Sequence, residues 1–467
     1  MMNIKANSKK AYKLMHDGVL ALARAEQQGI RIDMDYCEKQ KKGLTRRIIW
    51  AEKQFYETSF YRDWVDSLKG NAPNIYSPTQ LGVFLYKVKR FKPANTTKSG
   101  AGATGEESLE QLDLPELQML LTAKKLKKIR DTYLEQFVRE EVNGYLHPSF
   151  ALHLVRTFRS SSNNPNFQNI PKRDEEAKQI TRGALFPRHG HQLLELDFGS
   201  LEVRIAACYH QDPLMLKYIN DPSTDMHRDM AAEIFMMDID HHKKASHKIL
   251  RAATKNGFVF PEFYGDYYKN CAKSIACKWM GLSETCVWKK GMGLELEKGF
   301  HISDHFLTKG INNLEKFTKH VQDIEAIFWN DRFTVYNRWR ERWWKLYQRK
   351  GYFDTLTGFR CSGVMGKNEV INYPVQGSAF HCLLWTLNAL DSHITEKGLD
   401  TRIIGQIHDS VVLDVLPSER LAVVAASKNI ACVELSRAWD WINVPLTIDF
   451  EMAGVDQSFA EMREAIL

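Results

Sequence analysis

The chain has 467 residues, 44% of them hydrophobic and 26% charged, with a formal net charge of +7 and a pI near 8.8. At roughly 150 residues per domain, this length predicts about three structural units. No run of about 18 apolar residues occurs, and the N-terminus lacks an apolar signal core, so we expect no membrane association. The expected location is the cytoplasm, which for a viral protein would be the host cytoplasm.

Two features of the composition bear on partners. The eight cysteines form no Cys-x-x-Cys pair, so we expect reduced thiols rather than a zinc site. Residues 86–98 carry five basic residues and no acid, and residues 241–256 carry five with three histidines and no acid. Such clusters are typical of nucleic-acid binding, although many solvated surfaces are also basic. We expect the turn-rich segment 86–98 to hold DNA.

The expected elements are mainly helices before residue 146, and strands and loops appear after it. Periodic apolar positions predict helices over residues 9–70, and a second helical stretch ends near residue 141. After a loop-rich segment, HQLLELDFGSLEVRIAACY predicts a buried strand running into a helix. Residues 215–350 are mostly helical. A short hairpin, a long helix at INYPVQGSAFHCLLWTLNALDSHI, two strands joined by a tight turn and a last strand near PLTIDF follow.

Two aspartates stand where apolar strands end. Asp197 follows the run LLEL, and Asp409 occupies the turn in QIHDSVVLDV. A single aspartate in such a place is usually a turn or capping residue. Two of them, each displayed by apolar strands, could share a pair of divalent ions, because Mg²⁺ takes carboxylate and phosphate oxygens. Two ions about 4 Å apart activate a primer 3′-hydroxyl and stabilise the leaving pyrophosphate.

Four basic residues recur at helical steps, and aromatic residues follow them. The basic residues share one face of a predicted helix: Lys244, Lys248, Arg251 and Lys255. This face is either a solvated surface or a clamp for a triphosphate, since charged donors pair strongly with phosphate oxygens. The aromatic residues either form core or stack on bases: Phe258, Phe260, Phe263 and Tyr264.

Five motifs together resemble the family A DNA polymerases. In chain order they are RTFRSSSNNPNFQNIP, LDFGSLEVRIAA, RAATK with FYG, INYPVQGSA and QIHDSVVLDV. The resemblance implies an α+β right-hand fold with a helical thumb, helical fingers and a palm built on a small antiparallel sheet. The expected boundaries are thumb 1–145, palm 146–215 and 351–467, and fingers 216–350.

The resemblance also implies a role for each matching residue. Asp197 and Asp409, with the Phe198 carbonyl, would bind two Mg²⁺ ions, with Mn²⁺ as a substitute. The residues expected at the incoming dNTP are His227, Arg251, Lys255, Phe260, Tyr264 and the steric gate Glu202. Those expected to contact DNA are Arg159, Arg360, Asn372, Gln376, Gln406 and His408.

The sequence departs from the family pattern in three places. Counting from Lys255 makes Val259 the ring residue of the fingers helix, whereas counting back from Tyr264 gives Phe260, which we favour. One residue is therefore inserted, and we expect a helical bulge near Pro261. Ser410 stands where the bacterial enzymes have a glutamate. No exonuclease region precedes the thumb, so we expect any proofreading to come from a separate polypeptide.

We expect a phage-type DNA-templated DNA polymerase acting in replication. Its expected partners are primer-template DNA and dNTPs, with a separate exonuclease or processivity factor possible and no membrane. A single-subunit RNA polymerase shares the palm, but Glu202 argues against it. A catalytically silent DNA-binding subunit is the other alternative, and the presence of both aspartates argues against that.

Overall fold

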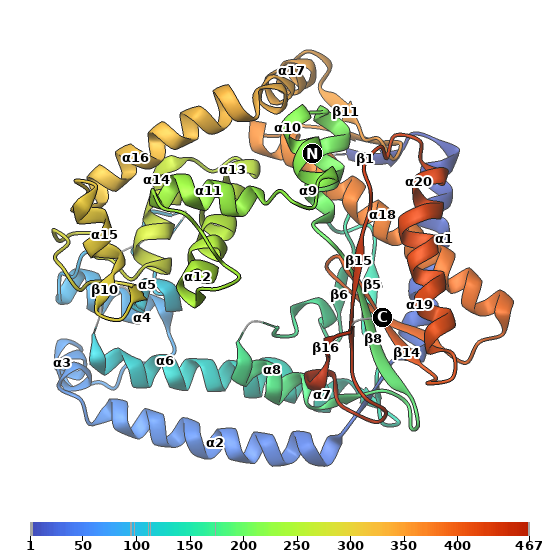
Figure 1. Cartoon of the computed structure of the whole chain (residues 1–467). Helices are drawn as coiled ribbons and strands as arrows, with labels where there is room; N and C mark the ends of the chain where they lie inside the picture. Colours follow the sequence, from blue (N-terminus) through green and yellow to red (C-terminus); the bar gives the residue numbers. More distant parts are fainter. Residues whose placement is uncertain are drawn as a thin grey trace.

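The computed structural model has an α+β architecture in three regions. It describes residues 3–93, 96–97, 99–110, 112, 114–172 and 174–465. In Figure 1, the main antiparallel sheet lies at the right, a long helical arm runs along the bottom and shorter helices lie at the upper left. The three regions surround a common centre. Among the described residues, no helix is both long enough and apolar enough to cross a membrane.

The main sheet carries both predicted catalytic strands. Its five strands are antiparallel and lie in the order β13 (Arg402–Ile407), β14 (Ser410–Val415), β8 (Gln192–Phe198), β15 (Ile448–Met452) and β16 (Arg463–Glu464). Both faces of β8 and β14 are covered, with Leu194 and Leu413 in one core and Leu193 and Val412 in another. This burial explains why both strands are mostly apolar on consecutive residues instead of alternating between apolar and polar ones.

Helices from distant parts of the sequence cover one face of this sheet. Helix α1 (Lys9–Gln28) packs against α18 (Lys367–Lys397) and β13. The same core includes residues of α9 (Leu201–His210), α19 (Arg420–Asn429) and α20 (Leu435–Ala438). Figure 1 shows α1, α18 and α19 together on the side of the sheet away from the centre.

A three-stranded sheet joins the N-terminus to this region. Strand β1 (Asn3–Ala6) pairs with β12 (Phe359–Ser362), which also pairs with β11 (Tyr352–Asp354) as the predicted hairpin. Residues 3–28 therefore lie with the main sheet, and the long arm begins only at α2 (Met34–Tyr56). The boundary at residue 145 and the other predicted domain limits remain predictions.

The arm consists mainly of α2 packed along α6 (Pro115–Lys128). The predicted helical region 9–70 is interrupted, because Gly29 ends α1 with a φ of +65° and β2 (Ile30–Ile32) follows. At the base of the arm β2 pairs with β4 (Tyr145–Leu146) and β7 (Leu185–Phe186). The other elements of the arm and of the segment leading to the main sheet are α3 (Ser59–Ser67), α4 (Pro78–Gly82), α5 (Glu106–Glu110), α7 (Glu135–Glu140), β3 (Glu141–Val142), β5 (Ser149–Ala151), β6 (Ser161–Asn163) and α8 (Glu175–Arg182).

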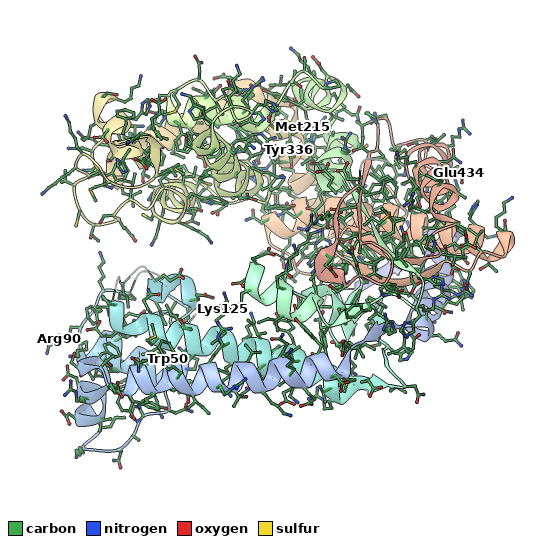
Figure 2. The ribbon with its side chains drawn as sticks, turned by 60° about the horizontal axis from the view of Figure 1, so that its bottom comes forward. Trp50, Arg90, Lys125, Met215, Tyr336 and Glu434 are labelled. Atoms are coloured by element: carbon green, nitrogen blue, oxygen red, sulfur yellow. The ribbon has the colours of Figure 1, made fainter. Side chains whose placement is uncertain are left out.

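The tip of the arm has its own core and carries the basic segment. Phe55, Trp64 and Phe84 are buried there. Arg90 projects at the end of the arm, far from the main sheet (Figure 2). Lys89 forms an ion pair with Asp63, so part of the positive charge is already matched within the protein. Residues 94, 95 and 98 of the predicted DNA-holding segment 86–98 lie outside the described residues.

The third region is mostly helical, as predicted for residues 215–350. Its aromatic core includes Phe258, Phe306, Phe317, Phe328 and Trp288. The helices are α10 (Pro213–Asn220), α11 (Met226–Phe235), α12 (Ala245–Thr254), α13 (Phe260–Phe263), α14 (Tyr268–Lys273), α15 (Ile302–Thr308), α16 (Leu314–Ile327) and α17 (Thr334–Lys350). A hairpin of β9 (Glu295–Glu297) and β10 (Phe300–His301) is the exception to the helical pattern.

Candidate active site

The structure brings Asp197 and Asp409 together at one end of the main sheet. Asp197 lies near the end of β8 opposite Ser410, the first residue of β14, and Asp409 occupies the turn just before that residue. The Phe198 amide donates a hydrogen bond of 3.3 Å to the Asp409 carbonyl oxygen, which holds the turn against β8. Desolvation, together with Glu195 and Asp409, raises the pKa of Asp197 to about 6. The two carboxylates thus repel each other, and a cation between them would relieve this repulsion.

This carboxylate pair fits a magnesium site that is completed by substrate. Within the described part of the chain, no group of three or more His, Cys, Asp and Glu side chains is arranged to hold a metal ion. Mg²⁺ commonly uses one or two carboxylates and takes its remaining ligands from water and phosphate oxygens. Two carboxylates therefore suit an ion whose remaining ligands come from water and from the phosphates of a substrate.

Ser410 points into the sheet rather than toward the carboxylate pair. Its hydroxyl oxygen lies 2.7 Å from a Glu195 carboxylate oxygen and 2.9 Å from the Ile407 carbonyl oxygen, and it can donate its one hydrogen to either. Glu195 is buried, and Lys172 lies 3.5 Å from it. The side chain at position 410 is thus engaged in packing and hydrogen bonding inside the protein.

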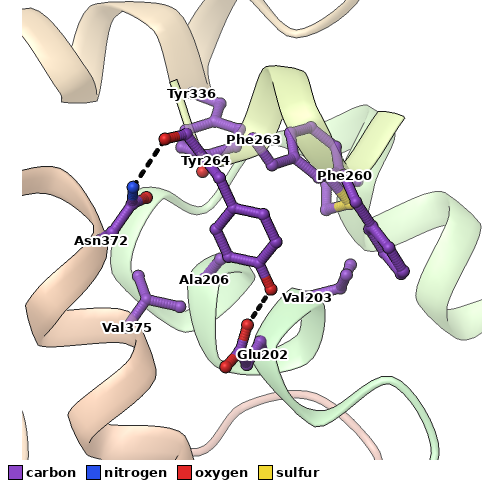
Figure 3. A pocket seen from close by; sticks show the side chains of 10 residues that line it. Glu202, Val203, Ala206, Phe260, Phe263, Tyr264, Tyr336, Asn372 and Val375 are labelled. Atoms are coloured by element: carbon purple, nitrogen blue, oxygen red, sulfur yellow. Dashed lines mark hydrogen bonds between the residues drawn. The ribbon is translucent and has the colours of Figure 1, made fainter. Parts of the chain in front are cut away.

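A small, mainly apolar pocket beside the carboxylates holds the predicted steric gate. Glu202, in the first turn of α9, accepts a hydrogen bond from the Tyr264 hydroxyl and pairs with Arg159. Asn372 of α18 donates a 2.7 Å hydrogen bond to the Tyr264 carbonyl oxygen. Figure 3 shows Tyr264 between these two partners, with Phe260 beside it. A carboxylate held on both sides presents a fixed wall to any ligand in this pocket.

The inserted residue forms a bulge in the helix, as the sequence predicted. Residues Lys255–Val259 form a π-helix between α12 and α13, and the Phe260 amide bonds to the Lys255 carbonyl oxygen, five residues back. The wider turn absorbs one extra residue without ending the helix. As a result Val259 is fully buried, whereas Phe260 lines the pocket with Glu202 and Tyr264. This geometry favours Phe260 as the ring residue.

Two predicted triphosphate-binding residues lie beside Phe260, and a third lies one helical turn away from one of them. The Lys255 ammonium is 5.3 Å from the centre of the Phe260 ring, and the His227 ring meets that ring edge-on at 5.6 Å. Arg251 lies one helical turn before Lys255. Burial, together with Arg251 and Lys255, lowers the pKa of His227 to about 4, so this histidine is neutral near pH 7. Burial and Arg251 likewise lower the pKa of Lys255.

The four basic residues of the predicted helical face divide into two pairs. Lys244 precedes α12 and forms a 2.7 Å ion pair with Glu297 of β9, and Lys248 is exposed. Arg251 lies on the wall of a pocket of about 400 Å³ that also contains His227. Lys255 is partly buried close to Arg251. The solvated-surface interpretation therefore suits the first pair, and the phosphate clamp suits the second.

The predicted DNA-contacting residues are only partly brought together. Asn372 and Gln376 lie one turn apart on α18. Gln406 is buried and accepts hydrogen bonds from Ser160 at 2.5 Å and Gln168 at 2.7 Å. Arg360 belongs to the separate sheet β1-β12-β11, where it pairs with Asp354 at 2.7 Å and covers the Tyr352 ring.

His408 lines a groove to which Arg360 does not contribute. It lies in the turn beside Asp409 with a φ of +51°. It lines a groove with Lys125 and Lys128 of the arm. This groove connects the base of the arm to the carboxylate end of the main sheet.

The sequence analysis missed a carboxyl pair between α13 and α16, of which one member is buried. Glu262 of α13 is buried and hydrogen-bonds to Glu325 of α16, and it also accepts a 2.9 Å bond from the Trp329 indole. Burial, opposed in part by that indole bond, raises the pKa of Glu262 to about 8. An acidic residue directly after a proline in an aromatic helix, PEFYG, was the available signal.

We expect the contact between Glu262 and Glu325 to lower the free energy of unfolding as the pH rises. Because the folded-state pKa exceeds the unfolded value, the neutral carboxyl stabilises the fold at low pH, and this contribution is lost as the pH rises through about 8. Glu262→Gln keeps a neutral side chain, so its melting temperature should rise relative to the wild type between pH 5.5 and 8.5. The exposed Glu315→Gln is the control. A Glu262→Gln difference that does not change with pH would contradict the prediction.

The fold and the site define the class of protein. The structure resembles the POL domain of Pol1 from M. smegmatis in complex with DNA primer-template and dNTP, with a TM-score of 0.73 and 22% identity, covering 96% of this chain and 70% of that one. The fold is thus that of a polymerase module. The family model for DNA polymerase family A matches residues 34–280, and the chain belongs to this family.

Bacterial DNA polymerase I proteins are among its relatives. The chain is 26% identical to that of Pseudomonas aeruginosa over 419 residues, covering 85% of this chain and 39% of the relative. It is 27% identical to the DNA polymerase I of Aquifex aeolicus, and the match covers 85% of this chain and 59% of that protein. The DNA polymerase I of Synechocystis is 34% identical over 221 residues, which are 46% of this chain and 21% of that protein. The chain therefore spans less than two thirds of the length of these curated relatives.

Proposed function

We propose that this chain is a template-directed DNA polymerase that adds deoxynucleotides to a primer 3′-hydroxyl in DNA replication. The observation that carries the proposal is the placement of Asp197 near the end of β8 and Asp409 in the turn before the adjacent β14, beside a pocket that contains Glu202 and Tyr264. Family membership and the polymerase fold support it. The proposed partners are primer-template DNA and dNTPs, and the proposed metal is Mg²⁺.

In this proposal, each group of residues has a separate task. Asp197 and Asp409 would hold two Mg²⁺ ions, which when bound activate the 3′-hydroxyl and neutralise charge on the phosphates. Arg251 and Lys255 would bind the triphosphate through charged hydrogen bonds. The neutral His227 would donate one N–H to a phosphate oxygen. The rings of Phe260 and Tyr264 would contact the paired bases.

The remaining assignments follow from the same proposal. The arm from α2 to α7 would act as the thumb, the region from α10 to α17 as the fingers, and the main sheet with α18 as the palm. Lys125 and Lys128, in the groove with His408, would contact the phosphates of the primer duplex. Assignment to a phage-type branch remains a prediction from the sequence, since the relatives above are bacterial.

Replacing Glu202 by alanine is expected to increase ribonucleotide incorporation. Arg159 and Tyr264 hold the Glu202 carboxylate in place, so it can exclude a 2′-hydroxyl by occupying its space. The ratio of kcat/KM for dNTP to that for rNTP should therefore fall in Glu202→Ala. Glu233→Ala, on α11, is the control and should leave this ratio unchanged. A constant ratio in Glu202→Ala would mean that another residue excludes the ribose.

Primer extension tests the proposed function directly. Purified protein, a primer-template and Mg²⁺ are incubated with dNTPs, with rNTPs or without nucleotide. Template-dependent extension with dNTPs alone supports the proposal. Extension mainly with rNTPs would favour the RNA polymerase, and DNA binding without extension would favour the silent DNA-binding subunit.

A further inference from the structure

Asp225 contacts two of the proposed triphosphate-binding residues at once. It precedes α11, and its Oδ1 accepts hydrogen bonds from the amides of His227 at 3.0 Å and Arg228 at 3.1 Å. The same carboxylate binds Arg251 of α12, with Oδ2 2.6 Å from Nε and Oδ1 3.1 Å from Nη2. One side chain thus connects the first turn of α11 to the guanidinium on α12.

The geometry of the Arg251 contact leaves part of the guanidinium available. A guanidinium presents its N–H donors in a rigid planar fork, and Asp225 uses the edge formed by Nε and Nη2. The Nη1 donors, on the other side of the fork, make no contact with Asp225. Arg251 and Asp225 both line the pocket of about 400 Å³. Because the guanidinium is rigid and planar, fixing its Nε–Nη2 edge also fixes the direction in which the Nη1 donors point.

A bound ligand could not easily displace Asp225 from Arg251, because the carboxylate has a second task. As the N-cap of α11 it satisfies two backbone amides that would otherwise lack partners at the helix end. Moving the carboxylate away would uncap the helix that carries His227. His241 lies 3.6 Å from Oδ2 and adds a further contact on the same side of the pocket.

We propose that Asp225 is a positioning residue, which orients the Arg251 guanidinium toward the triphosphate of the incoming nucleotide and sets the place of His227. This inference rests on the proposed polymerase function. Asp225 itself touches neither substrate nor metal in this scheme. Its charge acts through Arg251, so a substitution that removes the charge but keeps the helix cap should weaken triphosphate binding only when Arg251 is present.

The central test compares Asp225→Asn with the wild type. Asparagine caps a helix about as well as aspartate but lacks the charged pair with Arg251. Asp33→Asn is the matched control, because Asp33 caps α2 in the arm by accepting a 2.8 Å bond from the Tyr36 amide. The readouts are calorimetric binding of inorganic tripolyphosphate to the full chain, and kcat and KM for dNTP in primer extension.

Asp225→Asn should weaken tripolyphosphate binding and raise the dNTP KM about tenfold, with a smaller change in kcat. In an Arg251→Ala background the same substitution should have no further effect, since coupled residues are not additive. Asp33→Asn should match the wild type. Equal or tighter tripolyphosphate binding by Asp225→Asn, or additive effects with Arg251→Ala, would overturn the inference.

Two further outcomes distinguish failure of the Asp225 inference from failure of the proposed polymerase function. If the wild type binds tripolyphosphate and Asp225→Asn binds it weakly, but no primer is extended, the polymerase proposal fails while the positioning role stands. If the wild type extends primers and Asp225→Asn has a normal KM, the positioning role fails and the polymerase proposal stands. Melting temperatures of all variants identify any loss of binding that comes from unfolding.

Discussion

Replacing Asp197 or Asp409 by alanine is expected to abolish primer extension while leaving duplex affinity nearly unchanged. Both carboxylates lie at the same end of the main sheet, where β8 and β14 pair. In the proposed mechanism they are the side chains that hold the ions, so either loss removes the charge neutralisation that the reaction needs. DNA affinity comes mainly from Lys and Arg contacts with phosphates, which both variants retain. Single-turnover extension and duplex titration measure the two effects separately.

Asp440→Ala provides the control for this experiment. Asp440 is an exposed carboxylate in the loop between α20 and β15. Its removal changes the net charge by the same amount, so it should leave extension intact. Steady extension by Asp197→Ala or Asp409→Ala in Mg²⁺ would contradict the assignment of the catalytic pair.

The second large effect is expected at Lys255. The side chain is partly buried beside Arg251 and Phe260, on the proposed triphosphate side of the site. A hydrogen bond to a charged group contributes about 1.5–3 kcal/mol, which corresponds to roughly 10- to 150-fold. Lys255→Ala should therefore lower kcat/KM for dNTP within that range. Steady-state kinetics at saturating primer-template measure it.

Lys244→Ala is the matched comparison for Lys255→Ala. Both residues belong to the basic face predicted from the sequence, but Lys244 is occupied by its 2.7 Å ion pair with the exposed Glu297. Exposed ion pairs contribute little, so this substitution should change kcat/KM by less than about twofold. Equal losses in the two variants would favour the interpretation of the whole face as a solvated surface.

Much of the candidate site was predictable because its signals are local. The apolar runs of β8 and β14 marked strands, and an aspartate near the end of the first run and just before the second marked candidate ligands. The extra residue between Lys255 and Tyr264 predicted a helical bulge, which the π-helix Lys255–Val259 confirms. The strand β2 inside the predicted helical region was missed, because three apolar residues are too few to separate a strand from a helix by periodicity.

The sequence alone determined the order of the main helices and strands, the strand ends beside Asp197 and Asp409, and membership of DNA polymerase family A. Hydrophobic periodicity and motif order within short segments determine these properties. Only the tertiary structure decided that Asp225 binds Arg251, that Glu202 lies between Arg159 and Tyr264, and that Glu262 meets Glu325. These residues lie on different elements, so their contacts depend on how the helices pack and on which buried polar groups find partners.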